Sequence, residues 1–134
     1  MSVLYFDSSA LVKLVVTETG TDAIRDQLVT SGMWATSDLG YTEVQRAINR
    51  RQPDSWDDAW QMMNKLSRIT LDRDMYDLAG RLQPARLRSL DAIHVAAALS
   101  IGSDLTAVVT YDKRLAEAAQ LNGIPVLSPG VDNL

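Results

Sequence analysis

The sequence predicts an α/β fold, a three-layer α/β/α sandwich around a central, mainly parallel sheet. Short apolar runs alternate along the chain with longer segments in which apolar residues recur at helical spacing. The apolar runs lack polar alternation, which is typical of strands buried on both faces of a parallel sheet. We expect one domain, residues 1–134, because a chain of 134 residues can bury about two thirds of its unfolded surface.

The first half of the chain is expected to hold two strands and three longer helical segments. The strands are the apolar runs Val3–Phe6 and Met33–Thr36. Polar residues suited to helix starts precede each helix, and the three helices are expected over 10–16, from Thr21 to the stop at Ser31-Gly32, and from Ser37-Asp38 to about Arg51. Gln52-Pro53 then breaks the third helix, because proline lacks the backbone donor that a helix interior needs.

The second half continues the alternation of strand and helix. After a helix that restarts at Asp54-Ser55, we expect a strand at Ile69–Leu71, a helix from Asp72 to about Leu82, a loop over 84–88, a helix over 89–101, a strand at Ala107–Thr110, a helix at Asp112–Leu121 and a strand at Pro125–Leu127. The segment 89–101 is apolar nearly all round, which predicts a buried helix.

Composition excludes several classes of protein. The chain has no cysteine, which rules out disulfides and thiolate metal sites. Its apolar runs are far shorter than the roughly 20 residues of a membrane span. Asp7 and Lys13 interrupt the N-terminal apolar run, so we predict no signal peptide and expect a cytoplasmic protein. The net charge of −4 argues against a general nucleic-acid binder but not against a nuclease whose acids hold metal.

Four acids lie inside apolar runs, where a carboxylate is costly unless a positive group meets it: Asp7, Glu43, Asp91 and Asp112. Asp7 and Asp112 follow the first and fourth predicted strands, at the sheet edge where ligands of open α/β folds bind. A shared divalent cation is the simplest partner. Oxygen ligands suit Mg²⁺, and Mn²⁺ accepts the same set.

Each acid also has a purely structural explanation. Asp7 and Asp112 could cap helices, and Glu43 could pair with Arg46. Asp91 lies in the first turn of the most apolar helix, where the helix dipole favours an acid. Other chemistries fit less well, since the chain has no nucleophile elbow and no phosphate-binding glycine loop. We expect its single histidine, His94, to be packed or to support an acid rather than to act as a base.

The chain resembles PIN-domain ribonucleases and, within that group, the VapC toxins of bacterial and archaeal toxin–antitoxin pairs. Four segments carry the resemblance in the order that the family has them: Tyr5–Lys13, Ser37-Asp38-Leu39 leading to Glu43, Leu87–His94 and Val109–Leu115. Each segment alone is a short motif, and the four together are specific.

This resemblance implies a Rossmann-like sandwich and a Mg²⁺- or Mn²⁺-dependent endoribonuclease. It places the metal ligands at Asp7, Glu43, Asp91 and Asp112. It also implies that Ser8 and Thr110 support the acids by hydrogen bonding. The expected partners are an RNA substrate, a cognate antitoxin whose tail lies near the site, and a second copy of the chain in a homodimer.

Two further groups of residues have open assignments. Basic residues near the acids are expected to position the phosphate backbone: Lys13, Arg88, Lys113 and Arg114. Trp56, Trp60 and Met63 fall on one helical stripe, for which we favour core packing over a dimer or antitoxin interface. The alternative functions are a non-catalytic PIN-like module whose acids receive a basic segment of a partner, and a nuclease directed at DNA.

Overall fold

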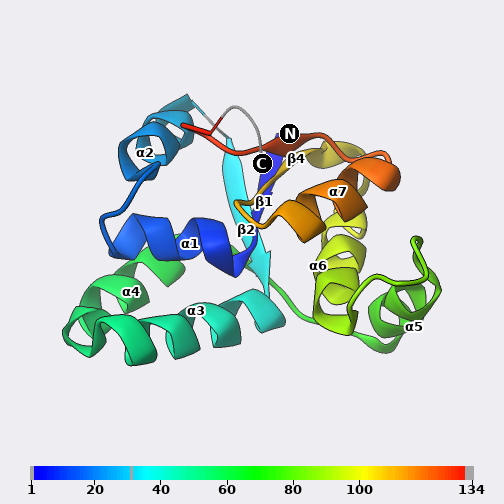
Figure 1. Ribbon diagram of the computed structural model, residues 1–134, viewed down its shortest axis with the longest axis horizontal. Coiled ribbons are helices and arrows are strands. Elements are labelled where there is room, and N and C mark those ends of the chain that lie inside the picture. Colours follow the sequence, from blue (N-terminus) through cyan, green and yellow to red (C-terminus); the bar gives the residue numbers. More distant parts are fainter. Residues whose placement is uncertain (1, 31, 132–134) are drawn as a thin grey trace.

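A five-stranded parallel sheet forms the centre of the computed structural model, which describes residues 2–30 and 32–131 (Figure 1). The strands are β1 (Val3–Phe6), β2 (Met33–Ser37), β3 (Ser67–Ile69), β4 (Leu105–Val109) and β5 (Val126–Leu127). They lie in the order β3-β2-β1-β4-β5, and every neighbouring pair is parallel. The predicted fold class is confirmed.

Seven α-helices join the strands in the described part of the chain. They are α1 (Ser8–Val15), α2 (Thr21–Thr30), α3 (Asp38–Arg51), α4 (Trp56–Met63), α5 (Arg73–Arg81), α6 (Ser89–Leu99) and α7 (Lys113–Leu121). Two short 3₁₀ turns precede α4 and β4, at Pro53–Ser55 and Gly102–Asp104. None of the helices among these residues is both long and apolar enough to cross a membrane.

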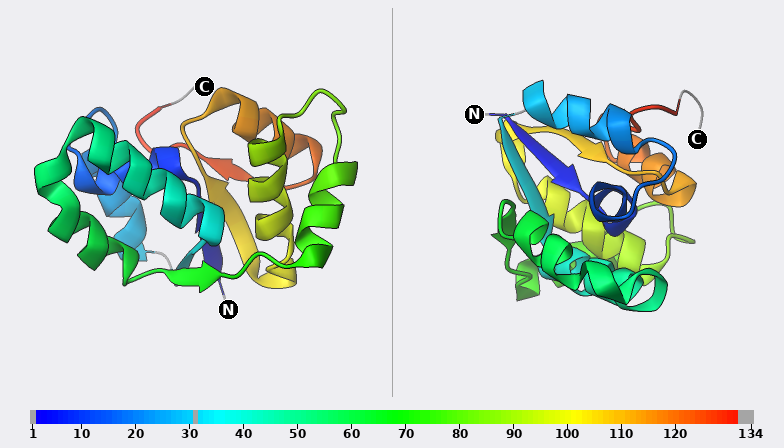
Figure 2. Two further views of the ribbon diagram at one scale, coloured as in Figure 1. Left: turned by 90° about the horizontal axis from the view of Figure 1, so that it is seen from below. Right: turned by 90° about the vertical axis from the view of Figure 1, so that its left-hand side faces the viewer.

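The helices cover both faces of the sheet. Leu4 and Phe6 of β1 pack with α1, α3 and α4 on one face, whereas Tyr5 between them packs with α6 and α7 on the other. Figure 2 shows the two groups of helices on opposite sides of the strands. Successive strand residues point to opposite faces, so one apolar run supplies both halves of the core.

Polar residues that follow the strands start the next helices. The carboxylate or hydroxyl of the capping residue accepts a backbone N–H in α1 (Asp7), α3 (Ser37), α5 (Asp72) and α7 (Asp112). These caps satisfy donors that have no partner within a helix. The predicted starts of α3, α5 and α7 are therefore correct to within one residue, whereas α1 starts at Ser8, two residues before the predicted Ala10.

Some predicted boundaries were wrong. Strand β3 lies at Ser67–Ile69 instead of Ile69–Leu71, since the register with β2 pairs Ala35 with Ser67. Leu71 lies past the strand, where its backbone N–H donates to Asp38. Helix α6 ends at Leu99, two residues before the predicted Ile101. The predicted stop of α2 at Ser31 lies outside the described residues.

The stripe on α4 divides between core and surface. Met63 is fully buried, whereas Trp56 and Trp60 are 43% and 48% exposed and stack on each other with ring centroids 6.5 Å apart. The expectation of core packing is correct for Met63 and wrong for the two tryptophans, because they lie on the solvent side of this short helix.

The strand order places a topological switch point between β1 and β4. The chain moves outward from β1 to β2 and β3, then returns across the sheet through α5 and α6 to β4. Ligands of open α/β sheets bind at such a point, beyond the carboxyl ends of the strands. The residues that follow β1 and β4, and the first turns of α3 and α6, meet at this edge.

Gly40 is required where α3 approaches β2. A Cβ at Gly40 would overlap Thr36 Oγ1, whose hydroxyl donates to the Phe6 carbonyl at 2.7 Å.

We expect Gly40→Ala to lower the free energy of unfolding by about 2–3 kcal/mol through overpacking. The matched control is Gly80→Ala in α5, where an added Cβ meets nothing within 4 Å. That change should be neutral or stabilise by up to ~1 kcal/mol. Equal urea midpoints for the two variants would contradict this account.

Candidate active site

The four predicted acids come from four elements at the switch-point edge. Glu43, Asp91 and Asp112 line one open cavity of about 590 Å³ between α3, α6 and α7. Asp7 does not line this cavity, because it is only 3% exposed. It connects to the cavity through Thr110, whose Oγ1 donates to Asp7 Oδ2 at 2.5 Å and accepts from the Asp112 backbone N–H at 3.0 Å.

Asp7 is a buried carboxylate held by hydroxyl groups. Besides Thr110, Ser9 donates from Oγ to Asp7 Oδ1 at 2.7 Å, and the Ala10 backbone N–H donates to the same oxygen at 3.0 Å. Ser9 therefore makes the contact that the family resemblance implied for Ser8. The Ser8 side chain makes no hydrogen bond to any described residue. Burial raises the pKa of the Asp7 carboxyl, although the two hydroxyl hydrogen bonds oppose the rise.

Glu43 is oriented by the only histidine of the chain. His94 Nε2 lies 2.5 Å from Glu43 Oε1, and His94 Nδ1 lies 2.8 Å from the hydroxyl of Tyr5. The histidine is 4% exposed and sits against the Tyr5 ring edge-on. It follows that His94 is packed and supports an acid.

The directions of these hydrogen bonds can be assigned from Ser37. Tyr5 donates its hydroxyl proton to Ser37 Oγ at 2.9 Å, so His94 Nδ1 must donate to the Tyr5 oxygen. The contact between His94 Nε2 and Glu43 then contains one proton, either on the ring or on the carboxyl group. Because both ring nitrogens are engaged, His94 has no free nitrogen to act as a base.

Asp91 faces the cavity without a hydrogen-bond partner among the described residues. Desolvation raises the pKa of its carboxyl, and the neighbouring charges of Asp112 and Glu43 raise it further, while His94 and Arg88 oppose them. Like charges at one site disfavour ionisation. A cation in the cavity would reverse this penalty.

Asp112 has a capping role as well as a place in the cavity. Its Oδ1 accepts from the backbone N–H groups of Arg114 and Leu115 at 2.9 and 3.3 Å. As their side chains stand, no three carboxylates or histidines in the described part of the chain are close enough together to enclose a metal ion. The acids surround one space without meeting at a point.

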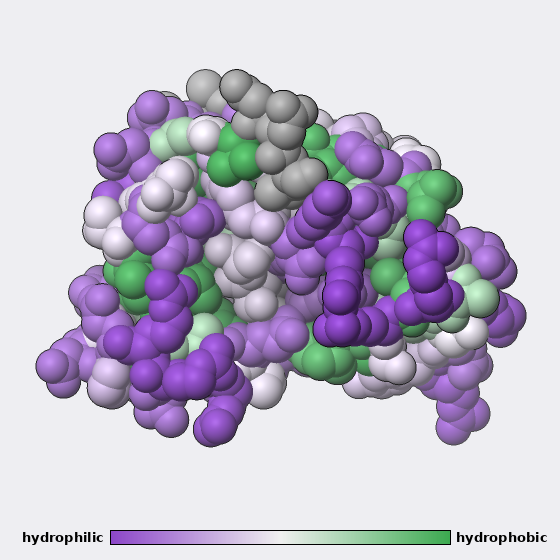
Figure 3. Space-filling view, viewed as in Figure 1, coloured by the Kyte–Doolittle hydropathy of each residue, from purple (hydrophilic) through white to green (hydrophobic). Residues whose placement is uncertain are grey.

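Three of the four predicted basic residues border the acids. Arg88, Lys113 and Arg114 line the same cavity, and none forms an ion pair with a described residue. Figure 3 shows hydrophilic side chains gathered over α7. Lys13 lies elsewhere, since its Nζ donates to Glu18 and to the Thr19 carbonyl and stacks over the Tyr111 ring. We therefore do not assign Lys13 to substrate binding.

Comparison with known proteins identifies the fold family. The family model of the PIN domain matches residues 4–121. A curated protein, Ribonuclease VapC46 of Mycobacterium tuberculosis, is 40% identical over 129 residues, which cover 96% of this chain and 99% of that protein. The chain belongs to the PIN-domain family, among relatives of the VapC group.

Solved structures show the same fold at low sequence identity. A toxin–antitoxin complex from Klebsiella pneumoniae matches with a TM-score of 0.73 and 20% identity, covering 94% of this chain and 97% of that chain. The crystal structure of Mycobacterium tuberculosis VapC20, titled a sarcin–ricin-loop-cleaving toxin, matches at 0.71 with 14% identity, covering 86% and 94%. Both place this PIN domain in the same α/β architecture.

Sequence reasoning named Thr110 and His94 as supports of the acids in this PIN domain but missed Ser9, Tyr5 and Ser37. Tyr5 and Ser37 sit within or at the end of strands, where they read as ordinary strand and cap residues. Their functional contacts depend on α6 crossing the sheet beside β2, which no local pattern reveals. Ser9 had a visible signal, since it lies two residues after Asp7, where a hydroxyl can turn back to the carboxylate.

The raised pKa of the Asp7 carboxyl predicts a pH dependence of stability for the metal-free PIN domain. A folded-state pKa above the unfolded value means that ionisation opposes folding, so stability is greatest below the unfolded pKa and falls as pH rises through the folded pKa. We expect Asp7→Asn to raise the melting temperature at pH 7 in EDTA by about 4 °C, the shift that ~1 kcal/mol produces in a domain of this size.

The matched control is Asp72→Asn, which changes an exposed cap of α5. This variant should show no such gain. A melting temperature of Asp7→Asn below that of the wild type at pH 7, measured by circular dichroism in EDTA, would contradict the account of Asp7.

Proposed function

We propose that this PIN domain, residues 1–134, is a divalent-cation-dependent endoribonuclease that hydrolyses RNA phosphodiester bonds in the cytoplasm. It acts as the toxin of a toxin–antitoxin pair. The observation that carries the proposal is the convergence of Glu43, Asp91 and Asp112 on one cavity, whose arginine and lysine side chains form no ion pair with a described residue. A relative 40% identical over nearly the whole chain bears the name ribonuclease, which supports the same chemistry.

The donor set fits Mg²⁺, with Mn²⁺ as the substitute. The candidate ligands are carboxylates at Asp7, Glu43, Asp91 and Asp112, and these two cations prefer oxygen donors. Burial is the main cause that raises the pKa of Asp91, and the negative charges of Asp112 and Glu43 raise it further. When bound, the cation would lower the pKa of a water molecule and stabilise charge on the attacked phosphate.

The chain's own residues then position the substrate. Arg88, Lys113 and Arg114 surround the acids and can bind phosphate oxygens on either side of the cleaved bond. Hydrolysis joins the oxygen of water to phosphorus and breaks the bond to the leaving ribose oxygen, which takes up a proton. His94 cannot remove the water proton, because its ring nitrogens are bonded to Tyr5 and Glu43. The proton would pass to one of the cavity carboxylates or to bulk water, and a cation held by the acids would assist by lowering the pKa of the attacking water.

We also propose the partners that this function requires. The structural match to a toxin–antitoxin complex supports a cognate antitoxin whose segment enters the acidic cavity. A homodimer is proposed as the working assembly. The exposed, stacked pair Trp56 and Trp60 supplies an aromatic surface of the kind enriched at protein interfaces.

A non-catalytic docking module is the second candidate. The observation in its favour is that no three acidic or histidine side chains of the described residues already enclose a metal position. Such a module would receive a basic partner segment without cleaving nucleic acid. Cleavage assays on matched RNA and DNA oligonucleotides separate this module, a DNA-directed nuclease and the proposed ribonuclease.

Removing single carboxylate charges tests the cation site. We expect Asp7→Asn, Asp91→Asn and Glu43→Gln each to reduce Mg²⁺-dependent cleavage of an RNA oligonucleotide by ~10²–10³-fold, with folded circular dichroism spectra. Asp72→Asn is the control, because Asp72 makes the same kind of helix cap away from the cavity. Full activity of folded Asp91→Asn would overturn the cation site.

Substitutions of His94 test whether it positions Glu43. In His94→Gln the amide nitrogen can replace Nε2 at Glu43, whereas in His94→Asn the shorter side chain reaches only towards Tyr5. We expect Mn²⁺ affinity, measured from the electron paramagnetic resonance of free Mn²⁺, to fall ~10–100-fold in His94→Asn and much less in His94→Gln. Wild-type Mn²⁺ affinity in both folded variants would show that His94 has only a packing role.

A further inference from the structure

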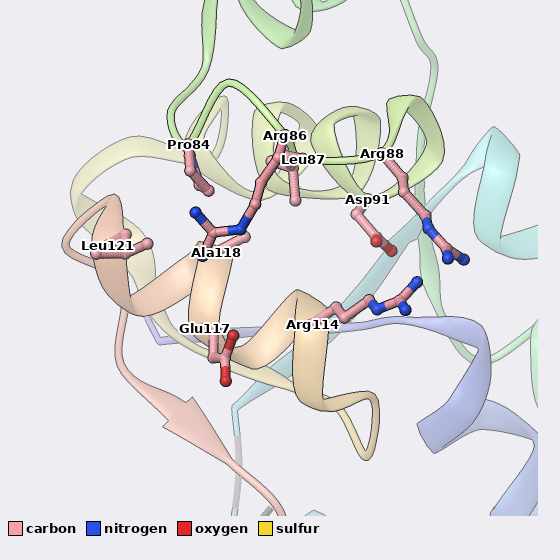
Figure 4. A pocket seen from close by; sticks show the side chains of 9 residues that line it. All are labelled: Pro84, Arg86, Leu87, Arg88, Asp91, Arg114, Glu117, Ala118 and Leu121. Atoms are coloured by element: carbon pink, nitrogen blue, oxygen red, sulfur yellow. The ribbon is translucent and has the colours of Figure 1, made fainter.

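A second cavity of about 380 Å³ adjoins the acidic one, between the loop that precedes α6 and the exposed side of α7. Arg88, Asp91 and Arg114 line both cavities, so the two form one continuous groove. Figure 4 shows these three side chains at one end of the second cavity and Arg86 reaching across its other end towards Ala118. A ligand held at the acids therefore continues into this space.

The lining of the second cavity combines apolar side chains with three arginines and two acids. Leu87 provides apolar surface, and Leu121, 65% exposed, extends it towards solvent, whereas Ala118 is almost fully buried and Glu117 adds a carboxylate. Arg86 makes no ion pair with any residue that the structure describes, and neither does Arg114. Apolar side chains beside guanidinium groups suit an unstacked nucleobase, since bases stack on apolar and arginine surfaces while arginine also binds phosphate.

We propose that this second cavity binds one unstacked nucleotide of single-stranded RNA, next to the phosphodiester held at the acids. Its base lies against Leu87 and Leu121, and Arg86 and Arg114 contact the base face and the adjoining phosphate. The volume falls at the low end of the ~300–1,000 Å³ typical of ligand pockets, which is room for one base and not for a paired duplex.

This assignment rests on the proposed ribonuclease function and deepens it. An acidic protein segment would also find arginines here, but it would gain little from the apolar wall. The continuity with the acidic cavity favours RNA further, because an acidic segment extended along the groove would meet Asp91 and Glu43. A nucleic acid strand instead brings its scissile phosphate to those acids together with the cations it requires.

The test compares Arg86→Ala, Leu121→Ser and a control, Arg25→Ala, in the full chain. Arg25 is exposed on α2, at the opposite side of the molecule from α5 and α7 (Figure 1). A single-stranded RNA oligonucleotide of mixed sequence is cleaved in Mg²⁺ at several salt concentrations. The measured quantities are kcat/KM, its salt dependence and the positions of the cut ends. Melting temperatures confirm that each variant is folded.

Arg86→Ala and Leu121→Ser should each lower kcat/KM by about 3–10-fold and change the ranking of cut sites. Arg86→Ala should also reduce the slope of log kcat/KM against log salt by ~0.7, the value for one lost phosphate contact on a single strand. Leu121→Ser should leave that slope unchanged, because it removes apolar surface and no charge. Arg25→Ala should resemble the wild type.

Other outcomes would overturn the assignment. Wild-type kinetics and cut sites in both folded variants would show that the cavity binds no nucleotide, while leaving the ribonuclease intact. Weaker inhibition of Arg86→Ala by a decaglutamate peptide, with RNA kinetics unchanged, would assign the cavity to an acidic protein segment. A wild-type protein that cleaves no RNA would overturn the proposed function and this inference with it.

Discussion

Uncompensated carboxylate charge at the carboxyl edge of the sheet is the constraint around which this site is built. Asp7 follows the central strand and is only 3% exposed, and the hydroxyl groups of Ser9 and Thr110 donate hydrogen bonds to its carboxylate. Hydroxyl groups solvate a carboxylate without neutralising it, so burial still raises its pKa. Folding therefore disfavours the ionised form of this carboxyl group unless a cation neutralises it.

The core of the molecule supports this charge directly. Tyr5 belongs to β1 and packs in the apolar layer with α6 and α7, yet its hydroxyl holds His94, which in turn holds Glu43. Ser37 accepts a hydrogen bond from the Tyr5 hydroxyl, and the same side chain caps α3, the helix that carries Glu43. The position of the Glu43 carboxylate consequently depends on the packing of three elements and not on the conformation of α3 alone. Partner hydrogen bonds of this kind fix the orientation of a ligand before a metal ion arrives.

The sequence was sufficient for the layers of the fold and for bringing Glu43, Asp91 and Asp112 to one cavity, whose role as a metal site stays a prediction, but it showed only part of what holds the acids. Continuous apolar runs indicated the buried parallel strands. Capping residues indicated the helix starts, because a capping residue contacts only the next few residues of the chain. Strand β3 was misplaced because two of its three residues are exposed, so its pairing with β2 leaves little trace in hydropathy. Ser9 and Thr110 each lie two residues from an acid in the sequence, Asp7 and Asp112 respectively. The contacts among Tyr5, Ser37 and His94 arise only from the topology of the fold. Lys13 resembled a substrate ligand in sequence, but its ammonium turns to Glu18 and Tyr111.

The distribution of charge around the groove separates two tasks. Acids from β1, α3, α6 and α7 lie at the sheet edge, while Arg86, Arg88 and Arg114 follow the outer side of the groove without ion pairs to described residues. Had the arginines paired with Asp91 or Asp112, the site would be electrically satisfied and would have no need of a cation or a phosphate. Because they stay apart, each set retains affinity for a charge that the other cannot supply. Under the proposed function, a chain of overall negative charge would bind a polyanion at this one edge, where local cations and not net charge determine the attraction.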